Sequence, residues 1–351
     1  MDYEAAADRL SWARLLHGRS GGDTVATTSG QAAGKPCCAS VLEFWDMLNL
    51  IARRLAVGLL VAFTVMTLAF MLTRLSGDLA ISIAGPSATQ ADVEIVRKAY
   101  GLDRPLYVQF FSWVGRAMVG DFGQSYFFKD SVANLIGRRL PITLTLGLVG
   151  LSLALIISIP LGIMAALREN SWVDRGVTMF TMVGQAIPSF WLALILMIVL
   201  GLNLGILPIS GTGTWQHFVM PGIVLAFTAI PALTRLTRSG MIEAMSSDYI
   251  RTARAKGLSR ARIVLKHALR NAAIPVVSIA AVQLGFMLGG SIVIETVFAL
   301  HGVGYLGWES IAKNDFPVVQ AVVLVLAAIY IGLTLLADIL NALLDPRLRT
   351  G

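Results

Sequence analysis

The sequence has few of the residues from which soluble enzymes and disulfide-stabilised domains are built. Only 14% of its residues are charged, against about 25% in ordinary soluble domains. Cysteine occurs twice, at the adjacent positions Cys37 and Cys38, so the sequence contains no disulfide framework. The four histidines lack the spacing of a metal site: they are His17, His217, His267 and His301. We therefore exclude a disulfide scaffold and expect no metal site.

Catalytic motifs are also missing. The phosphate-binding pattern G-x-x-x-x-G-K-[ST] does not occur. The nearest string, Gly30–Pro36, has one residue too few between its glycines and a proline after the lysine. No Ser/His/Asp or Cys/His set occurs at suitable positions. The sequence thus predicts no catalytic residues and no cofactor bound by this chain.

Long apolar runs dominate what is present. The sequence is 56% hydrophobic with a mean hydropathy of +0.72. The net charge of +7 does not indicate a nucleic-acid partner, because the basic residues flank apolar runs and form no basic domain with interleaved aromatics. Six runs reach the roughly 20 residues that a helix needs to cross a bilayer: Leu55–Thr73, Ile142–Leu167, Val177–Leu200, Phe218–Leu236, Ala272–Phe298 and Val318–Ala337. We predict an all-α membrane protein with six transmembrane helices surrounded by lipid.

Prolines and small residues within these runs have structural interpretations. Pro160, Pro188 and Pro231 lie inside predicted spans. Gating kinks are one alternative, and we favour tolerated bends, since neighbouring helices can satisfy the backbone groups that proline frees. The consecutive small residues Gly289, Gly290 and Ser291 lie inside the fifth run and predict close helix packing.

The distribution of Lys and Arg orients the chain, because cytoplasmic loops are enriched in these residues. With the N-terminus inside, the predicted cytoplasmic segments hold 19 of the 28 Lys and Arg residues. Eight of the other nine lie in the long first loop, where length weakens the rule. We therefore predict that both termini are cytoplasmic.

Residues 1–46 differ from the rest of the chain. The stretch Gly18–Gly34 is rich in Gly, Ser, Thr and Ala without an apolar period, which predicts disorder. No secretory signal is present, because no apolar core precedes a small-residue cleavage site. Two alternatives stay open: a native unstructured tail, or an extension that the native chain lacks because it starts near Met47. The permease domain is then 47–351.

The loop of residues 75–139 is too long for a plain connection and should carry structure. We expect a helix over Ala91–Tyr100 with Thr89 as its cap, a turn at Gly101–Leu106, and an amphipathic aromatic helix over Gln109–Val119. A second turn is expected at Gly120–Ser125. Two alternatives remain open for this outer loop: an inert cap, or a docking surface for a binding protein.

The basic segment Ser246–Pro275, within a predicted loop of residues 239–272, organises the rest of the chain. It predicts two short helices joined at Gly257, where a residue able to take positive φ is favoured. Ser247 or Asp248 is the expected N-cap of the first helix and Ser259 that of the second. The apolar positions of the second helix fall on one face of a 3.6-residue period: Ala261, Val264, Leu265, Ala268 and Leu269. The opposite face is basic: Arg262, Lys266 and Arg270.

This segment resembles the cytoplasmic loop of ABC-importer permeases, in the dipeptide/oligopeptide/nickel branch of that family. The general motif of the loop begins Glu-Ala-Ala, where this sequence has Arg251-Thr252-Ala253, and later has Leu-Pro, where this sequence has Leu269-Arg270. These departures are those of the peptide branch. Further similar strings extend the resemblance over residues 47–349: Gly101–Leu106, Gly120–Ser125, Arg139–Pro141, Ile187–Trp191, Gly205–Pro208, Glu295–Phe298, Gly302–Gly304, Asn314–Pro317 and Asp345–Arg349.

The resemblance implies a type I ABC-importer permease fold and a function for the loop. Its first helix would insert into a cleft of a separate ATPase and couple ATP hydrolysis to transport. The alternative is a solvated basic helix next to the membrane that docks nothing. The implied ATPase-coupling residues are consecutive: Asp248, Tyr249, Ile250, Arg251, Thr252, Ala253, Arg254, Ala255, Lys256 and Gly257.

The resemblance also implies the partners and the location. These are a second, homologous and non-identical permease subunit, two ABC ATPase subunits that use ATP and Mg²⁺, and an extracytoplasmic substrate-binding protein, all at the bacterial cytoplasmic (inner) membrane. The implied substrates are di- or oligopeptides, with nickel chelates, glutathione, opines or oligosaccharides as alternatives. The substrate-pathway residues are not identified by the sequence.

Three other classes of protein are alternatives: an ion-coupled secondary transporter, an intramembrane enzyme and a passive channel. Proton or sodium coupling requires polar groups inside the membrane, which are costly and functional there. The candidates are few: Gln185, Gln283, Glu295 and Asp338. We expect Glu295 and Asp338 to lie near helix ends within reach of water or head groups, in structural roles. The scarcity of such groups argues against ion coupling, and the lack of a catalytic set argues against an enzyme.

Overall fold

The computed structural model describes residues 37–75, 78–85 and 87–344. The chain divides after Leu42, and the helical bundle belongs to the part from Glu43 onward. The prediction of disorder for residues 1–46 falls outside the described residues up to position 36, and residues 37–46 are helical as the start of α1. The all-α prediction is confirmed, because the elements of the described ranges are helices and only an isolated bridge joins Gln124 to Ser131.

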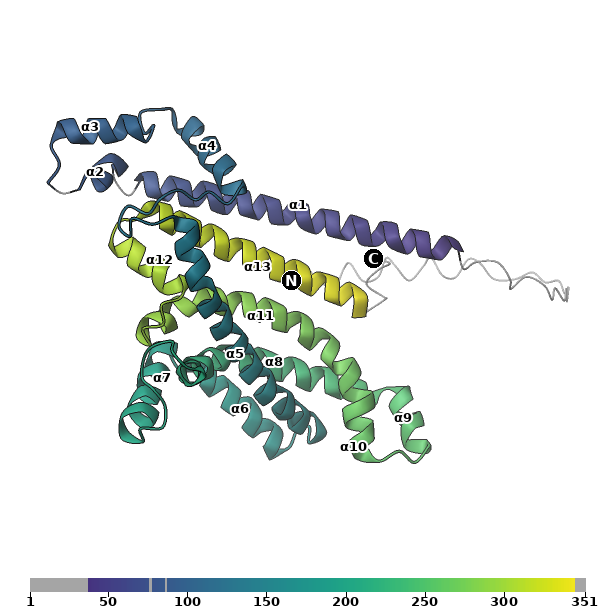
Figure 1. Cartoon of the computed structure of the whole chain (residues 1–351). Coiled ribbons are helices and arrows are strands. Elements are labelled where there is room, and N and C mark those ends of the chain that lie inside the picture. Colours follow the sequence, from purple (N-terminus) through teal and green to yellow (C-terminus); the bar gives the residue numbers. More distant parts are fainter. Residues whose placement is uncertain (1–36, 76–77, 86, 345–351) are drawn as a thin grey trace, which may run out of the picture. The chain divides into compact units, whose positions relative to one another are not determined.

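The helices follow one another along the chain with short connections (Figure 1). In chain order they are α1 (Cys37–Leu75), α2 (Leu79–Ala84), α3 (Gln90–Ala99), α4 (Leu106–Met118), α5 (Val132–Leu167), α6 (Trp172–Ala186), α7 (Ser189–Leu196), the π-helix η2 (Met197–Asn203), the 3₁₀-helix η3 (Trp215–Phe218), α8 (Val219–Ser246), α9 (Asp248–Ala255), α10 (Arg260–Arg262), the π-helix η4 (Ile263–Ala268), α11 (Leu269–Val297), α12 (Val303–Ala312) and α13 (Phe316–Leu344).

Within the described ranges, five continuous helical segments are long and apolar enough to cross a membrane. They are Ala52–Leu75, Val132–Leu167, Trp215–Ser246, Arg260–Val297 and Phe316–Asn341. The bent pair Trp172–Ala186 and Ser189–Asn203 makes a sixth if it is counted as one span. The predicted spans therefore correspond to helices in the structure, although α5 begins at Val132, inside the loop predicted for residues 75–139.

The third predicted span is broken at a proline. α6 and α7 meet at an angle of 96°, with Ile187 extended at φ −77° and ψ 122°. A residue before proline is pushed out of the α region by the proline ring, so the helix ends there. Our interpretation of Pro188 as a tolerated bend is therefore wrong. It holds for Pro160 and Pro231, which lie inside the continuous helices α5 and α8.

The core of the bundle is formed by α5, α8 and α11, and glycines on α5 allow the closest approach to α8. A Cβ atom on Gly162 would lie 2.6 Å from the Cβ of Thr237, and one on Gly150 would lie 2.9 Å from the Cβ of Leu225. The packing prediction for Gly289 and Gly290 is wrong within this chain, because a Cβ at either position would meet nothing within 4 Å. These two glycines are exposed, whereas Ser291 is buried.

Three short helices lie between α1 and α5, at one end of the bundle (Figure 1). The helix expected at Ala91–Tyr100 is confirmed as α3, and Thr89 caps it in a reciprocal box with Asp92. The Thr89 hydroxyl and amide donate to the Asp92 carboxylate, which lowers the pKa of Asp92. The aromatic helix expected at Gln109–Val119 is confirmed as α4 and begins three residues earlier.

The buried carboxylate of Glu295 joins α11 to the segment that follows it. Its Oε1 accepts hydrogen bonds from the hydroxyls of Thr143 (2.7 Å) and Ser291 (2.9 Å), and its Oε2 accepts one from the amide of Tyr305 (2.8 Å). Glu295 is fully buried, so the expectation that it reaches water or head groups is wrong. Its contacts are those of a structural group.

Candidate functional site

The candidate site is α9, the short helix between α8 and α10. Its start follows from Ser247, which has the extended backbone of an N-cap residue and whose carbonyl accepts from the amides of Ile250 and Arg251. The predicted side-chain caps are not formed, because the Ser247 hydroxyl donates to the carbonyl of Ala244 at 2.5 Å, and Ser259 makes no cap hydrogen bond either. Asp248 instead forms an ion pair with Arg251 at 2.8 Å.

The end of α9 is set by Gly257, as predicted. Its φ of +74° is one that residues with a Cβ rarely adopt. The amide of Gly257 donates to the carbonyl of Arg254 (2.9 Å) and that of Leu258 donates to the carbonyl of Ala253 (3.3 Å). A Cβ added at Gly257 would meet no atom of the described chain within 4 Å, so within this chain the requirement for glycine is conformational.

Two residues of α9 fix it to the bundle. Ile250 is fully buried and Ala253 nearly so. They pack in an apolar cluster with residues of α8, η4 and α11: Met241, Ala244, Ile263, Val264, Ala268 and Ala272. The side-chain amide of Asn271 also donates to the hydroxyl of Tyr249 at 2.8 Å. The short helix is therefore anchored to α8 on one side and to the start of α11 on the other.

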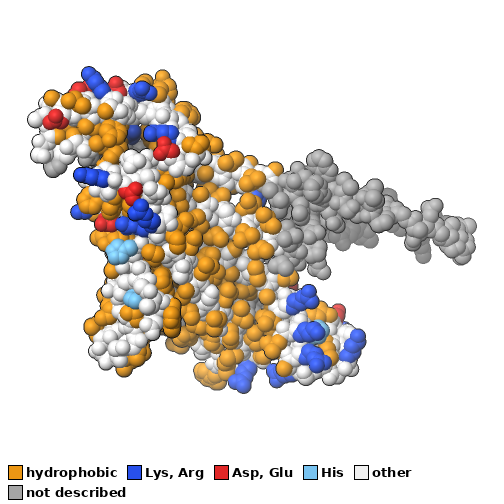
Figure 2. Space-filling view, viewed as in Figure 1, with side chains coloured by type: hydrophobic (Ala, Val, Ile, Leu, Met, Phe, Trp, Pro, Cys, Tyr) orange, Lys and Arg blue, Asp and Glu red, His pale blue; other side chains and the backbone are white. Residues whose placement is uncertain are grey.

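The remaining residues of the predicted coupling set are exposed. They are Asp248, Tyr249, Arg251, Thr252, Arg254, Ala255, Lys256 and Gly257. Figure 2 shows Lys and Arg side chains gathered at this end of the bundle, whereas the end with α3 and α4 carries charges of both signs. The sequence predicted ten consecutive coupling residues. In the structure two of them, Ile250 and Ala253, are buried and anchor α9, and the other eight form an exposed, mainly basic face.

The second helix of the predicted loop differs from the expectation. Its middle is the π-helix η4, in which backbone hydrogen bonds join residues five apart, so Ile263 and Ala268 both face the apolar cluster. Ala261 and Leu265, which the 3.6-residue period placed on the apolar face, are exposed, whereas Ile263, which it did not place there, is buried. The helix also continues without a break into the membrane-spanning segment Arg260–Val297.

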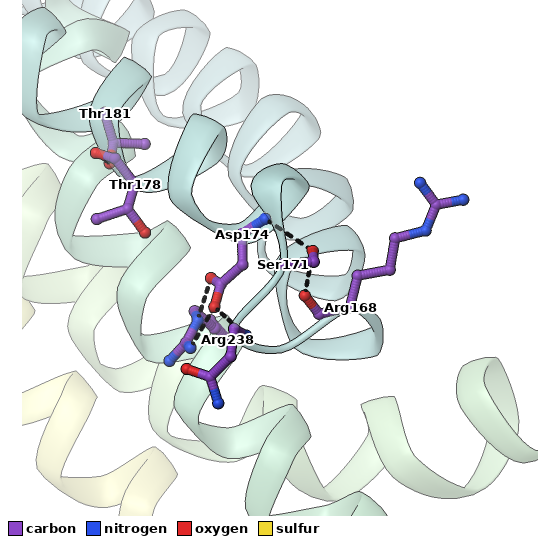
Figure 3. Close-up of polar contacts among 7 residues, drawn as sticks. Arg168, Ser171, Asp174, Thr178, Thr181 and Arg238 are labelled. Atoms are coloured by element: carbon purple, nitrogen blue, oxygen red, sulfur yellow. Dashed lines mark hydrogen bonds and ion pairs between the residues drawn. The ribbon is translucent and has the colours of Figure 1, made fainter.

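A partly buried ion pair lies where α6 begins beside α8 (Figure 3). The Asp174 carboxylate accepts from Nε of Arg238 at 2.6 Å and from its Nη2 at 2.7 Å. Asp174 also accepts from the amide of Asn170, and its own amide donates to the Ser171 hydroxyl. Sequence reasoning missed this pair. One signal was Ser171 three residues before Asp174, which is a helix-start pattern; Arg238 lies two residues after the end of the fourth apolar run and carries no comparable local signal.

Within the described ranges, no group of three or more His, Cys, Asp or Glu side chains is placed to hold a metal ion.

Family models match most of the chain. Residues 158–350 match the binding-protein-dependent transport system inner membrane component, and residues 47–147 match the N-terminal model of such membrane components. The chain belongs to this family. It is the permease subunit of a binding-protein-dependent ABC importer, in the dipeptide/oligopeptide branch, and a multi-pass protein of the bacterial inner membrane.

Relatives and solved structures agree with this assignment. The glutathione transport system permease protein GsiC of Escherichia coli strain K12 is 40% identical over 304 residues, which is 86% of this chain and 99% of GsiC. The oligopeptide transport system permease protein AppB of Bacillus subtilis is 40% identical over 310 residues, which is 85% of this chain and 98% of AppB. An inward-facing structure of the MetNI methionine ABC transporter has a TM-score of 0.53 at 20% identity, over 60% of this chain and 96% of that one, which supports the type I permease fold.

Proposed function

We propose that this permease imports di- or oligopeptides, and that α9 couples it to the partner ATPase. Support for the substrate comes from the similarity to the oligopeptide permease AppB. Glutathione is the second candidate, because the permease GsiC is equally similar. Glutathione is itself a small peptide with free carboxylates, so the two candidates share their chemistry.

The coupling role is supported by the way α9 packs against the bundle. Its buried residues Ile250 and Ala253 pack on α8 and on the helix that continues into α11, while the residues around them are exposed. A force applied to the exposed face is therefore transmitted to two candidate spans, because close-packed side chains resist compression. ATP-driven closure of two ATPase subunits would push on this face and switch the pathway between inward- and outward-facing states.

The proposal includes the other components of the importer. A second, homologous permease chain would complete the pathway, and an extracytoplasmic binding protein would deliver the substrate. ATP and Mg²⁺ would be bound by two ATPase subunits and not by this chain. The permease then contributes no catalytic residue of its own.

The test is uptake by intact cells that lack this gene and are complemented with variants. Wild type should restore ATP-dependent uptake of labelled trialanine, with labelled glutathione measured in parallel. Ala255→Arg adds a long charged side chain to the exposed end of α9 and should reduce uptake to the level of the deletion strain. Ala91→Arg makes the same change at an exposed position of α3 and should leave uptake unchanged.

The outcomes separate the parts of the proposal. If the cells take up glutathione but not trialanine, glutathione replaces peptides as the proposed substrate and the coupling mechanism still stands. Full uptake by Ala255→Arg at normal membrane levels would contradict coupling through α9. Uptake driven by an ion gradient in the absence of ATP would support the secondary-transporter alternative.

A further inference from the structure

A cavity of about 420 Å³ lies among the helices that join α1 to α5. Its walls come from the last turns of α1, from α4, from the turns on either side of α4, and from the start of α13. The volume falls within the range of about 300–1,000 Å³ that is usual for small-molecule sites. It lies away from α9, and nothing in the coupling mechanism uses it.

The charges around this cavity are unbalanced. Three arginines line it, Arg74, Arg104 and Arg116, against one carboxylate, Asp121. Within the described ranges, none of the three arginines forms an ion pair with a carboxylate. Asp121 accepts from the amide of Gly123 at 3.0 Å. The walls therefore hold three positive charges against one negative charge, and no ion pair within the described chain neutralises the arginines.

Unmet hydrogen-bonding capacity accompanies this charge. Nε of Arg74 is buried without a partner, and its guanidinium lies 4.9 Å from the centre of the Phe70 ring. Oε1 of Gln109 is likewise buried without a partner. The Nε2 of Gln109 donates to the carbonyls of Leu102 (3.1 Å) and Arg104 (2.7 Å), which assigns the nitrogen and the oxygen of this amide, since an oxygen could not donate to the two carbonyls. An unpaired donor and an unpaired acceptor thus belong to the walls of one cavity.

The remaining wall is aromatic and neutral. Trp113, Tyr100 and Tyr126 line the cavity, and the rings of Tyr100 and Tyr126 contact each other edge to face at 5.9 Å. Burial raises the pKa of Tyr126 to about 12, although the nearby Arg74 and Arg116 act in the opposite direction. The phenol therefore stays protonated at physiological pH and can donate a hydrogen bond.

We propose that this cavity is a binding site for a small organic carboxylate, and specifically for the C-terminal carboxylate of a short peptide. The juxtaposition of uncompensated arginines, an unpaired Gln109 oxygen and aromatic walls fits that chemistry. Arginine forks pair with planar carboxylates, the amide N–H next to a C-terminal carboxylate is a donor for Gln109 after a local side-chain shift, and aromatic faces accept an apolar side chain. The peptide identity rests on the proposed function, whereas the carboxylate site does not.

The test is calorimetric titration of the complete transporter in nanodiscs, without ATP and without binding protein. The probes are trialanine, trialanine C-terminal amide, glutathione and inorganic phosphate. Trialanine should bind, and its amide should bind at least about tenfold more weakly, because a charge-assisted hydrogen-bond pair is lost. Glutathione should compete with trialanine for the same site.

Variants locate the site. Arg74→Gln and Arg104→Gln should each weaken trialanine binding about tenfold. Neither side chain has an ion-pair partner to lose, so the unfolding temperature should fall only by what the loss of the contact between Arg74 and the Phe70 ring costs in the first variant. Arg138→Gln is the matched control, because Arg138 lies outside the cavity and is largely exposed. Equal affinity for trialanine and its amide, or equal binding by Arg74→Gln and Arg104→Gln, would overturn the site. If phosphate binds as tightly as trialanine or more tightly, the proposed ligand is a phosphate group and not a carboxylate, which would overturn the proposal.

The same titrations separate this inference from the proposed function. If trialanine binding depends on the arginines but the transporter does not import peptides, the carboxylate site is supported and the proposal of peptide import is wrong. Normal peptide uptake without carboxylate-dependent binding would remove the site alone.

Discussion

Gly257 combines a positive φ with open surroundings in this chain. Asparagine tolerates the left-handed region, whereas a β-branched residue is strained there by about 1–2 kcal/mol. We predict that Gly257→Asn keeps more uptake than Gly257→Val, and that Gly257→Arg inserts into the membrane but does not transport. Uptake and membrane levels of the three variants check this order. Equal loss in the Asn and Val variants would mean that docking needs the bare surface of glycine, beyond its backbone conformation.

Single residues also show the limit of reasoning from sequence. Thr89 and Gly257 were predicted because caps and left-handed turns depend on neighbours in the chain. Glu295 was misjudged because its partners, Thr143 and Tyr305, come from other elements. Asp315 is similar, since its buried carboxylate accepts from the amides of Tyr126 and Phe127 across the fold. Long-range partners of a buried charge leave no local pattern.

The Asp174–Arg238 pair is one of the contacts between α6 and α8, beside the rings of Phe180 and Phe227. Arg238→Lys cannot reproduce the two parallel hydrogen bonds, and Asp174 is almost fully buried while Arg238 is partly exposed. We predict a loss of about 1–2 kcal/mol in the free energy of unfolding, seen as a lower unfolding temperature of the purified transporter. Arg235→Lys, at an exposed position three residues earlier, is the control. An equal effect of both substitutions would show that the pair contributes nothing specific.

The sequence predicted helices well where the length of an apolar run determines them, and poorly where the backbone departs from a regular α-helix. The run Val177–Leu200 satisfied the length of a span, yet the break at Pro188 turns the chain by 96°. The 3.6-residue period placed Leu265 on the same face as Val264 and Ala268, but the π-helix η4 shifts the register, and Leu265 is exposed while the other two are buried. Neither departure changes composition, so hydropathy and periodicity do not reveal it.

At the scale of the whole molecule, the family and the type I fold were both accessible from sequence, because the spans and loop strings that resemble the family extend over most of the chain. The seating of α9 was not accessible, since it depends on an apolar cluster assembled from α8, η4 and α11. The arginine-lined cavity was also missed, because its three arginines lie 12 to 42 residues apart in the sequence. Our orientation of the termini stays a prediction.

The central claim is that the exposed face of α9 contacts the partner ATPase. The direct measurement is cross-linking in the assembled transporter from Ala255→Cys, in a background where Cys37 and Cys38 are replaced by Ser. We predict a cross-link to the ATPase subunit, identified by mass spectrometry, whose yield changes when ATP is added, and no such product from Ala91→Cys on α3. An assembled, active transporter in which Ala255→Cys gives no ATPase cross-link, or in which Ala91→Cys gives it instead, would contradict the account.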